Sequence, residues 1–433
     1  MKYRSPWAVA FVLALLPAAA VAQNDSTVVR LTMADAIERA WQNSPELVRA
    51  EGTVTTTGWS ERTAKGAFLP GLSMSSGASR SSSRRFDERT QTTIDGSNQS
   101  YSAGASLSYD LFTGGRRGAE MNRAEANSAS AEASMVEARF SVILQTKTAF
   151  FNVQRQEELL QVARGNVQRA QGALEAAQRR LEVGSAMRSD VLRAQLELNN
   201  ARQAVLSAQT QQRSASYALG ALTGIAGPVG GRVDSLAVPR ALPLDDAQIS
   251  QIAVERSPGV VTADATVNSA RAATSVARAQ YLPTLRFSSG YDWSNEEATF
   301  NNGNTGWNMR LSMSYPLFNG FSRENQVAGA DVQLRNATSA LAAAQRQVRA
   351  DVERVLGQLR LAEQQIVLAH EAVAVAQEDL RVNQERYRLS MSTILDLLLS
   401  QNSLRSAESN VVGARYDYEI ARAELEALIG RQL

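Results

Sequence analysis

Hydrophobic and small residues recur along the chain in alternating steps of three and four, in two long segments. Leu160, Ala163 and Val167 open the first series, which continues to Leu181. An equivalent series opens at Ile366, 206 residues further on. This alternation keeps one seam of a helix facing a neighbour around a left-handed supercoil, so both segments are predicted to be heptad helices.

A second heptad series follows each of the first, beginning at Leu198 and at Leu404. The residues most typical of a turn between consecutive series are Val183 to Ser185 and Leu389 to Met391. Each half of the chain is therefore expected to fold back on itself as an antiparallel helix pair. The predicted pairs span about 116–222 and about 322–429.

Ahead of each helix pair, apolar and polar residues alternate with a period of two. The alternation runs from Tyr101 to Leu111 and, more cleanly, from Trp307 to Leu317. About 11 residues is the length of a tilted strand that crosses a membrane. A companion strand, serine-rich in the first case, precedes each, which predicts hairpins at about 71–112 and about 284–318. Their polar tips are expected to be exposed loops, at Phe86–Ser100 and Ser294–Gly306.

The order of helix, hairpin and helix pair occurs twice in the chain. Two dipeptides recur 213 positions apart, as Ser44-Pro45 with Ser257-Pro258 and Leu69-Pro70 with Leu282-Pro283. From Tyr109 onward the displacement is 206, so the first hairpin holds seven more residues than the second. The predicted organisation is repeat 1 at 23–223, a glycine- and proline-rich linker that belts the helices at 224–243, and repeat 2 at 244–433.

Four strands are too few to close a barrel. A barrel that leaves no edge open in lipid needs about eight strands or more, and three chains would supply twelve. A soluble two-sheet domain is the alternative, but aromatic residues near the strand ends, among them Trp293, Trp307 and Tyr315, favour membrane interfaces. The predicted fold class is mainly α with membrane β, in which each chain supplies one third of a twelve-stranded pore.

The composition excludes several classes of function, and the amino-terminal sequence indicates that the chain is exported. The 433 residues contain no cysteine and one histidine, His370, so we expect no lipid-anchor cysteine, metal, cofactor or enzyme activity. Lys2 and Arg4, an apolar run and Ala20-Val21-Ala22 predict a signal peptide at 1–22. Its removal would take the net charge from +2 to 0, which leaves no electrostatic footprint for nucleic acid.

Taken together, these features resemble the TolC-like outer-membrane efflux family, the outer membrane factors. The resemblance rests on the signal peptide, the double repeat, Leu-Pro before and Leu-Phe-x-Gly after each hairpin, and the turn Val183-Gly184-x5-Asp190-Val191-Leu192. It implies a homotrimer in outer-membrane lipid, with a trimeric twelve-stranded β-barrel continued by a long α-helical coiled-coil barrel in the periplasm of a Gram-negative-type bacterium. It also implies a passive exit duct of a tripartite efflux or type I secretion system, working with an inner-membrane pump and a periplasmic adaptor.

The resemblance places the site at the two turns between the long helices. The turn residues that it assigns to adaptor contact are Arg180, Leu181, Val183 and Gly184 in the first repeat, and Arg386, Leu389 and Ser390 in the second. The glycine of the first turn is thus a serine in the second.

A periplasmic gate is implied beside these turns, around Asp190, Asp396 and Tyr387. Two positions depart from the family pattern: Ser392 stands where the best-known gates have arginine, and Leu399 where they have a second acid. A constriction partly closed by Leu399 is therefore expected in place of an arginine-aspartate-tyrosine lock.

The same residues also allow plainer roles. An aspartate in a first helical turn is favoured by free backbone amides and the helix dipole, so Asp190 and Asp396 could simply begin helices. Tyr387 lies on a heptad seam, where packing explains it equally well. For the whole chain, the alternatives are a periplasmic coiled-coil adaptor or a structural stalk protein, which would not need two matched hairpins. The cargo, whether drug, metal ion, protein or polysaccharide, is not encoded in these patterns.

Overall fold

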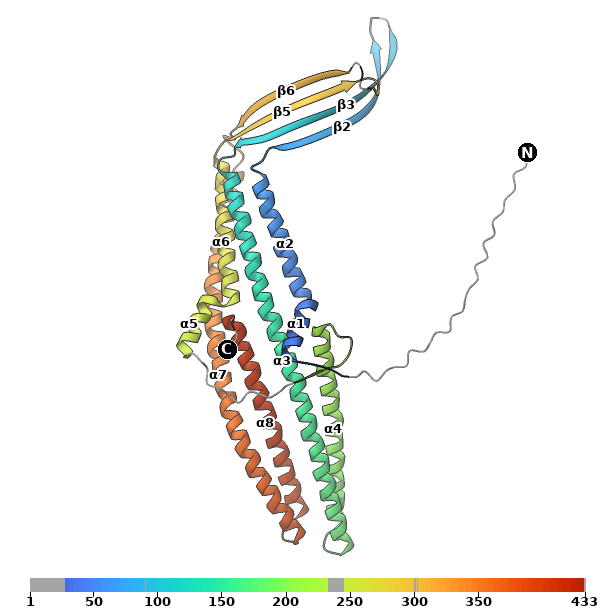
Figure 1. Ribbon diagram of the computed structural model, residues 1–433, viewed down its shortest axis with the longest axis vertical. Helices are drawn as coiled ribbons and strands as arrows, with labels where there is room; N and C mark the ends of the chain where they lie inside the picture. Colours follow the sequence, from blue (N-terminus) through green and yellow to red (C-terminus); the bar gives the residue numbers. More distant parts are fainter. Residues whose placement is uncertain (1–27, 90, 233–244, 300, 302, 432–433) are drawn as a thin grey trace, which may run out of the picture.

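The chain forms an elongated structure with a curved sheet at one end and long helices running away from it (Figure 1). The computed structural model describes residues 28–431 except 90, 233–244, 300 and 302. The predicted signal peptide, 1–22, and most of the predicted linker, 224–243, lie outside the described residues. No described helix contains a stretch that is both apolar enough and long enough to cross a membrane.

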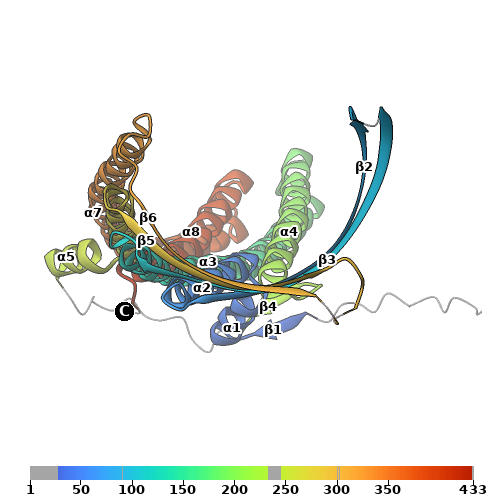
Figure 2. The same ribbon diagram turned by 90° about the horizontal axis from the view of Figure 1, so that it is seen from above.

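The sheet joins the hairpins of the two repeats. Its strands are β2 (Gly71–Asp87), β3 (Thr92–Phe112), β5 (Thr284–Asn295) and β6 (Asn304–Ser314). Neighbours are antiparallel in the order β2-β3-β5-β6, so the two hairpins meet where β3 pairs with β5. The sheet is strongly curved when seen from above (Figure 2). Among the described strands, the outer edges of β2 and β6 have no partner.

The first hairpin is more extended than the sequence predicts. The expectation of a loop over Phe86–Ser100 is wrong, because the β2–β3 ladder continues until Asp87 lies opposite Thr92. A ladder is held by backbone hydrogen bonds, which do not require the apolar alternation that stops near Tyr101. Since β5 ends at Asn295, opposite Tyr101, the outer part of this hairpin is a two-stranded ribbon beyond the sheet (Figure 1).

Below the sheet, each repeat contributes a long helix that folds back as a shorter one. The pairs are α3 (Arg116–Glu182) with α4 (Arg188–Thr223), and α7 (Ser322–Arg388) with α8 (Ile394–Ile429). The 67 residues of α3 span about 100 Å at about 1.5 Å per residue. Leu174, Leu198 and Leu380 belong to one buried cluster that joins the two pairs, and α3 packs against α8 between them.

Two shorter helices lead up to the hairpins. α2 (Pro45–Gly66) packs on α3, and α6 (Pro258–Arg278) packs against both α3 and α7 (Figure 1). Each begins at the repeated Ser-Pro pair, in which serine is the N-cap and proline takes the first helical position. Proline suits that position because its missing N–H is not needed there.

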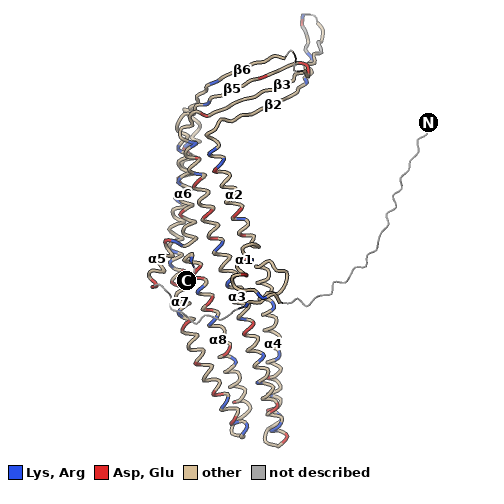
Figure 3. The backbone as a smooth tube through the Cα atoms, in the orientation of Figure 1, with Lys and Arg blue, Asp and Glu red and all other residues tan. Residues whose placement is uncertain are grey.

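The remaining short elements lie part-way down the column and at the foot of the sheet. They are β1 (Val29–Leu31), α1 (Met33–Asn43), β4 (Val229–Gly231), α5 (Asp246–Arg256) and the 3-10 turn η1 (Ala279–Tyr281). β1 pairs with β4 in parallel, which ties the start of repeat 1 to the beginning of the predicted linker. Basic and acidic residues are interspersed along the described helices and are fewer along the sheet (Figure 3).

Glycine makes the bend from strand to helix in both repeats. Gly114 has a φ of 63° and Gly320 a φ of 64°. A Cβ at Gly114 would lie 2.5 Å from the Cβ of Leu282 and 2.9 Å from the carbonyl oxygen of Ala279. The position therefore needs both the conformational freedom of glycine and its lack of a side chain.

Candidate functional site

The sequence-assigned residues gather at the two turns, at the end of the helices farthest from the sheet (Figure 1). The first turn is a Schellman motif, in which the amide of Ser185 donates to the carbonyl of Arg180 at 2.8 Å and the amide of Gly184 to that of Leu181 at 2.9 Å. Gly184 has a φ of 75°, the left-handed conformation that this motif requires.

The second turn has the same geometry with different residues. The amide of Met391 donates to the carbonyl of Arg386 at 2.8 Å, and the amide of Ser390 to that of Tyr387 at 3.1 Å. Ser390 adopts a φ of 64° although it carries a side chain. The left-handed conformation costs such a residue about 1–2 kcal/mol. The exchange of glycine for serine therefore adds backbone strain and leaves the turn geometry intact.

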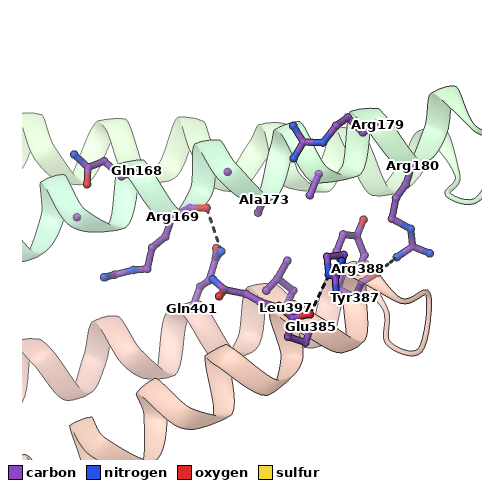
Figure 4. Close-up of a pocket in the computed structure, with 14 residues that line it drawn as sticks. Gln168, Arg169, Ala173, Arg179, Arg180, Glu385, Tyr387, Arg388, Leu397 and Gln401 are labelled. Carbon is purple, nitrogen blue, oxygen red and sulfur yellow. Dashed lines mark hydrogen bonds and ion pairs between the residues drawn. The ribbon is translucent and has the colours of Figure 1, made fainter.

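One arginine closes each turn from the side. Arg180 donates from Nη2 to the carbonyl of Ser185 at 3.0 Å, and Arg386 donates from Nη2 to the carbonyl of Met391 at 3.4 Å. Among the described contacts, Arg180 also reaches the other helix pair, whereas Arg386 does not. Arg180 donates from Nη1 to the carbonyl of Tyr387 at 2.9 Å, and its Cζ lies 4.3 Å from the centre of the tyrosine ring (Figure 4).

Tyr387 is the buried member of this contact. Its side chain is 3% exposed, and its hydroxyl oxygen is shielded from solvent. Burial raises the pKa of Tyr387 above its ordinary value, and the positive charge of Arg180 offsets part of the rise. Arg180 therefore contacts both the backbone carbonyl and the ring of Tyr387.

The two aspartates lie in the first turns of the returning helices, Asp190 in α4 and Asp396 in α8. Asp396 accepts at Oδ2 from the amide and hydroxyl of Thr393, at 2.9 and 2.8 Å, and donates its own amide to Thr393 Oγ1 at 3.2 Å. These bonds form a capping box and hold the pKa of Asp396 below its usual value. Asp190 accepts at Oδ2 from the amide of Met187 at 3.2 Å. Among the described contacts, no hydrogen bond joins Asp190 to Tyr387.

A groove of about 700 Å³ separates the two helix pairs next to the turns (Figure 4). α3 forms one wall, and α7 and α8 form the other. Arg169 makes a bidentate ion pair with Glu408 at 2.8 and 3.2 Å, and its carbonyl accepts from Gln401 Nε2 at 3.1 Å. Arg388 pairs with Glu385 at 2.9 Å. Charged groups therefore flank the groove on both sides.

The remaining assigned residues do not meet one another in the single chain. Val183 and Leu389 lie at the turns and are 78% and 59% exposed, and Leu399 is 57% exposed on α8. Ser392 donates from Oγ to the carbonyl of Asn383 at 3.5 Å. The constriction at Leu399 needs further copies of the chain and stays a prediction.

A polar cluster on the second helix pair was not predicted from the sequence. Asn383 donates to Asp379 Oδ1 at 3.0 Å and to Ser400 Oγ at 2.8 Å, and Ser400 donates to Asp379 Oδ2 at 2.5 Å. The positions 206 residues earlier are three buried alanines, Ala173, Ala177 and Ala194. Comparing the repeats position by position would have revealed this difference.

Two repeats of helix, hairpin and long helix pair, sharing one open antiparallel sheet, are the fold of outer-membrane channels. The outer membrane protein VceC of Vibrio cholerae has this fold, with a TM-score of 0.77 and 22% identity, over 92% of this chain and 96% of that one. Among relatives in sequence, the protein CyaE of Bordetella pertussis is 29% identical over 391 residues, 88% of this chain and 80% of that protein. The outer membrane protein TolC of Vibrio cholerae is 23% identical over 434 residues, 96% of this chain and 95% of that protein.

The sequence profile of the family described as outer membrane efflux protein matches residues 36–225 and 249–431, one segment in each repeat. The chain belongs to the outer membrane efflux protein family. The predicted family, the mainly helical two-repeat fold and the function as an outer-membrane efflux channel are thereby confirmed. The family is one of transport channels and not of enzymes.

Proposed function

We propose that three copies of the chain close into one duct, with a twelve-stranded barrel in the outer membrane and a coiled-coil helical barrel below it in the periplasm. The observation that carries this proposal is the curved four-stranded sheet whose edges, β2 and β6, lack partners among the described strands. A bare edge presents amides and carbonyls that hydrocarbon cannot satisfy. Pairing β6 of one copy with β2 of the next satisfies both edges.

The two faces of the sheet support the same arrangement. On β6, Trp307, Met309 and Met313 alternate with polar residues and are 73%, 66% and 70% exposed in the single chain. Arg310, in the same strand, is on the opposite face. An apolar outer face and a polar inner face are what a membrane barrel with a watery lumen requires.

Exposed leucines on the helices support packing between copies. Leu192, Leu196 and Leu206 on α4 are 60%, 61% and 64% exposed, and Leu368 on α7 is 62% exposed. Apolar side chains in such numbers on long helices are typical of an interface. Neighbouring copies would cover them and complete the helical barrel.

The turns support a protein partner at the periplasmic end. Val183 and Met187 at the first turn are 78% and 73% exposed, and Leu389 and Met391 at the second are 59% and 65% exposed. We assign this surface to a periplasmic adaptor, which connects the duct to an inner-membrane pump that supplies the energy. The duct itself is passive, and the same level of the column holds the proposed gate at Asp190, Asp396, Tyr387, Ser392 and Leu399.

The proposal is tested by expressing the whole chain in a Gram-negative host and separating the membranes. We expect export with loss of residues 1–22, recovery in the outer membrane, a mass in detergent of three chains, and stepwise ion conductance in planar bilayers. A soluble periplasmic monomer without conductance would contradict it and would favour the adaptor or stalk alternative.

A further inference from the structure

The charged residues of the sheet are divided unequally between its two faces. Residues directly opposite each other in an antiparallel ladder point to the same face, and the face alternates along each strand. The ladders therefore define one face across all four strands, made of the even positions of 72–84 and the odd positions of 97–109, 285–295 and 305–313. We call it the apolar face, because it carries Leu72, Met74, Trp307 and Met309.

On the apolar face, the charged residues within these ranges are two arginines of β2, Arg80 and Arg84. Both side chains are exposed, and no aspartate or glutamate occupies this face within the same ranges. The opposite face holds charges of both signs, at Asp110, Arg286, Asp292 and Arg310. There Arg286 donates from Nε to Asp110 Oδ1 at 2.6 Å. The charge of the apolar face is therefore positive only.

Arg80 lies just beyond the aromatic residues at the far end of the sheet. It follows Ala78 along the apolar face, and Ala78 pairs with Tyr101, which pairs in turn with the last residue of β5. Trp293 lies one position nearer the helices on the same face. Aromatic residues in such places mark the boundary between hydrocarbon and headgroups. Arg80 is therefore at headgroup level, and Arg84 is about 13 Å further along the strand.

The neighbours of Arg80 on this face are polar and uncharged. Gln99 lies directly opposite it, and Ser82 is the next residue of β2 on the same face. Arg84 lies opposite Asp95 and has a contact within the chain. A guanidinium has five N–H donors, so it can hold a second acceptor. Guanidinium, amide and hydroxyl groups are all donors to phosphate, and arginine can donate two parallel hydrogen bonds to it.

We propose that Arg80, with Arg84 beyond it, binds the phosphate groups of lipopolysaccharide, the anionic glycolipid of the outer leaflet. This inference rests on the proposed function, which puts the helices in the periplasm and therefore this end of the sheet at the outer leaflet. An arginine on the lipid-facing side of a barrel is costly at the membrane centre and tolerated near its surface, where a phosphate can neutralise it. Each copy in the trimer carries one such surface.

The experiment uses the full-length trimer, purified in detergent. It is titrated with lipid A that carries its phosphates and with the same lipid A after their enzymatic removal. Native mass spectrometry counts the lipids bound to each trimer. We expect the phosphorylated form to bind about ten-fold more tightly, and more weakly as the salt concentration rises. Inorganic phosphate at constant ionic strength should not displace it, because the acyl chains supply the rest of the affinity.

The two faces of the sheet supply matched variants. Arg80→Gln should weaken binding of phosphorylated lipid A about ten-fold, and adding Arg84→Gln should weaken it further, since each change removes charge-assisted hydrogen bonds. Arg310→Gln removes the same charge from the opposite face and should leave binding unchanged. Arg80→Ser combined with Ser81→Arg moves the guanidinium across the sheet at constant composition and should bind as weakly as Arg80→Gln. Arg80→Lys keeps the charge and should bind between the wild type and Arg80→Gln.

Three results would overturn the inference. If the wild type binds both forms of lipid A equally, only the acyl chains are held. If Arg310→Gln weakens binding as much as Arg80→Gln, net charge and not this face is responsible. If inorganic phosphate displaces the lipid, the surface takes a free anion.

The trimer mass and the conductance in phospholipid bilayers are measured first for every variant, so a folding defect is recognised. A wild-type protein that forms no trimeric channel would contradict the proposed function. A wild-type channel that conducts but does not distinguish the two forms of lipid A would contradict this inference alone.

Discussion

The two helical tips share one backbone and differ in their side chains. Both turns have the same hydrogen bonds and a closing arginine, but Gly184 relaxes the first turn whereas Ser390 strains the second. Leu181 leaves the first tip partly open to solvent, whereas Tyr387 is buried in the second. A duplicated turn can therefore keep its geometry while one copy, at Tyr387, acquires a contact to the neighbouring helix pair.

The seams of the two helix pairs differ more than the turns do, so exchanging their residues should have the largest effect on stability. Ala177 is fully buried, and its repeat-2 counterpart is Asn383, which has two hydrogen-bond partners. Ala177→Asn would overfill the first seam and bury an amide without partners, so we expect a loss of about 3 kcal/mol. Thermal unfolding in detergent, at one fixed scan rate, measures the change.

Adding Ala173→Asp and Ala194→Ser to Ala177→Asn would rebuild the polar cluster of the second pair in the first. We expect this triple variant to recover part of the lost stability, because the amide then regains its two partners. A triple variant no more stable than Ala177→Asn would mean that the two seams differ in backbone as well as in side chains.

The left-handed residues of the turns provide a smaller effect with opposite signs. Gly184→Ala should destabilise the first turn by about 1 kcal/mol, and Ser390→Gly should stabilise the second by about 1 kcal/mol. A Cβ at Gly184 meets nothing within 4 Å, so only backbone strain is involved. The unfolding temperatures of the two variants, measured side by side, test whether the shifts have opposite signs. Shifts of the same sign would contradict the shared geometry of the turns.

The smallest expected effect is the response of the second turn to acid. Hydrogen bonds from the Thr393 backbone and hydroxyl lower the pKa of Asp396 in the folded protein. Its stabilising contribution is therefore complete above the pKa of an aspartate in the unfolded chain and is lost as the pH falls through the lower pKa of the folded protein. The unfolding temperature of the wild type should fall slightly more than that of Asp396→Asn between about pH 5 and about pH 2. Parallel curves would show that the capping box does not contribute.

Periodic patterns in the sequence predict the helices, the hairpins and the repeat, because they follow from which face of each element is buried. Backbone pairing has no such pattern, which is why the ribbon beyond Tyr101 was expected to be a loop. Contacts between distant segments also cannot be predicted from these patterns. The contact between Arg180 and Tyr387, for example, depends on how the two helix pairs are placed beside each other. The polar cluster at Asn383 could have been predicted from the sequence, because the displacement of 206 residues between the repeats aligns its members with alanines.

The long helices of the two repeats have equal lengths. α3 and α7 each have 67 residues, and α4 and α8 each have 36, so the seven extra residues of repeat 1 lie in its hairpin. One residue inserted into each helix of a single pair would move that tip about 1.5 Å farther from the sheet and rotate it by about 100°. A partner at the periplasmic end would then meet an uneven rim. The equal helix lengths keep the two tips at the same level. The helical part can therefore change length without an uneven end only if the helices of both repeats change together.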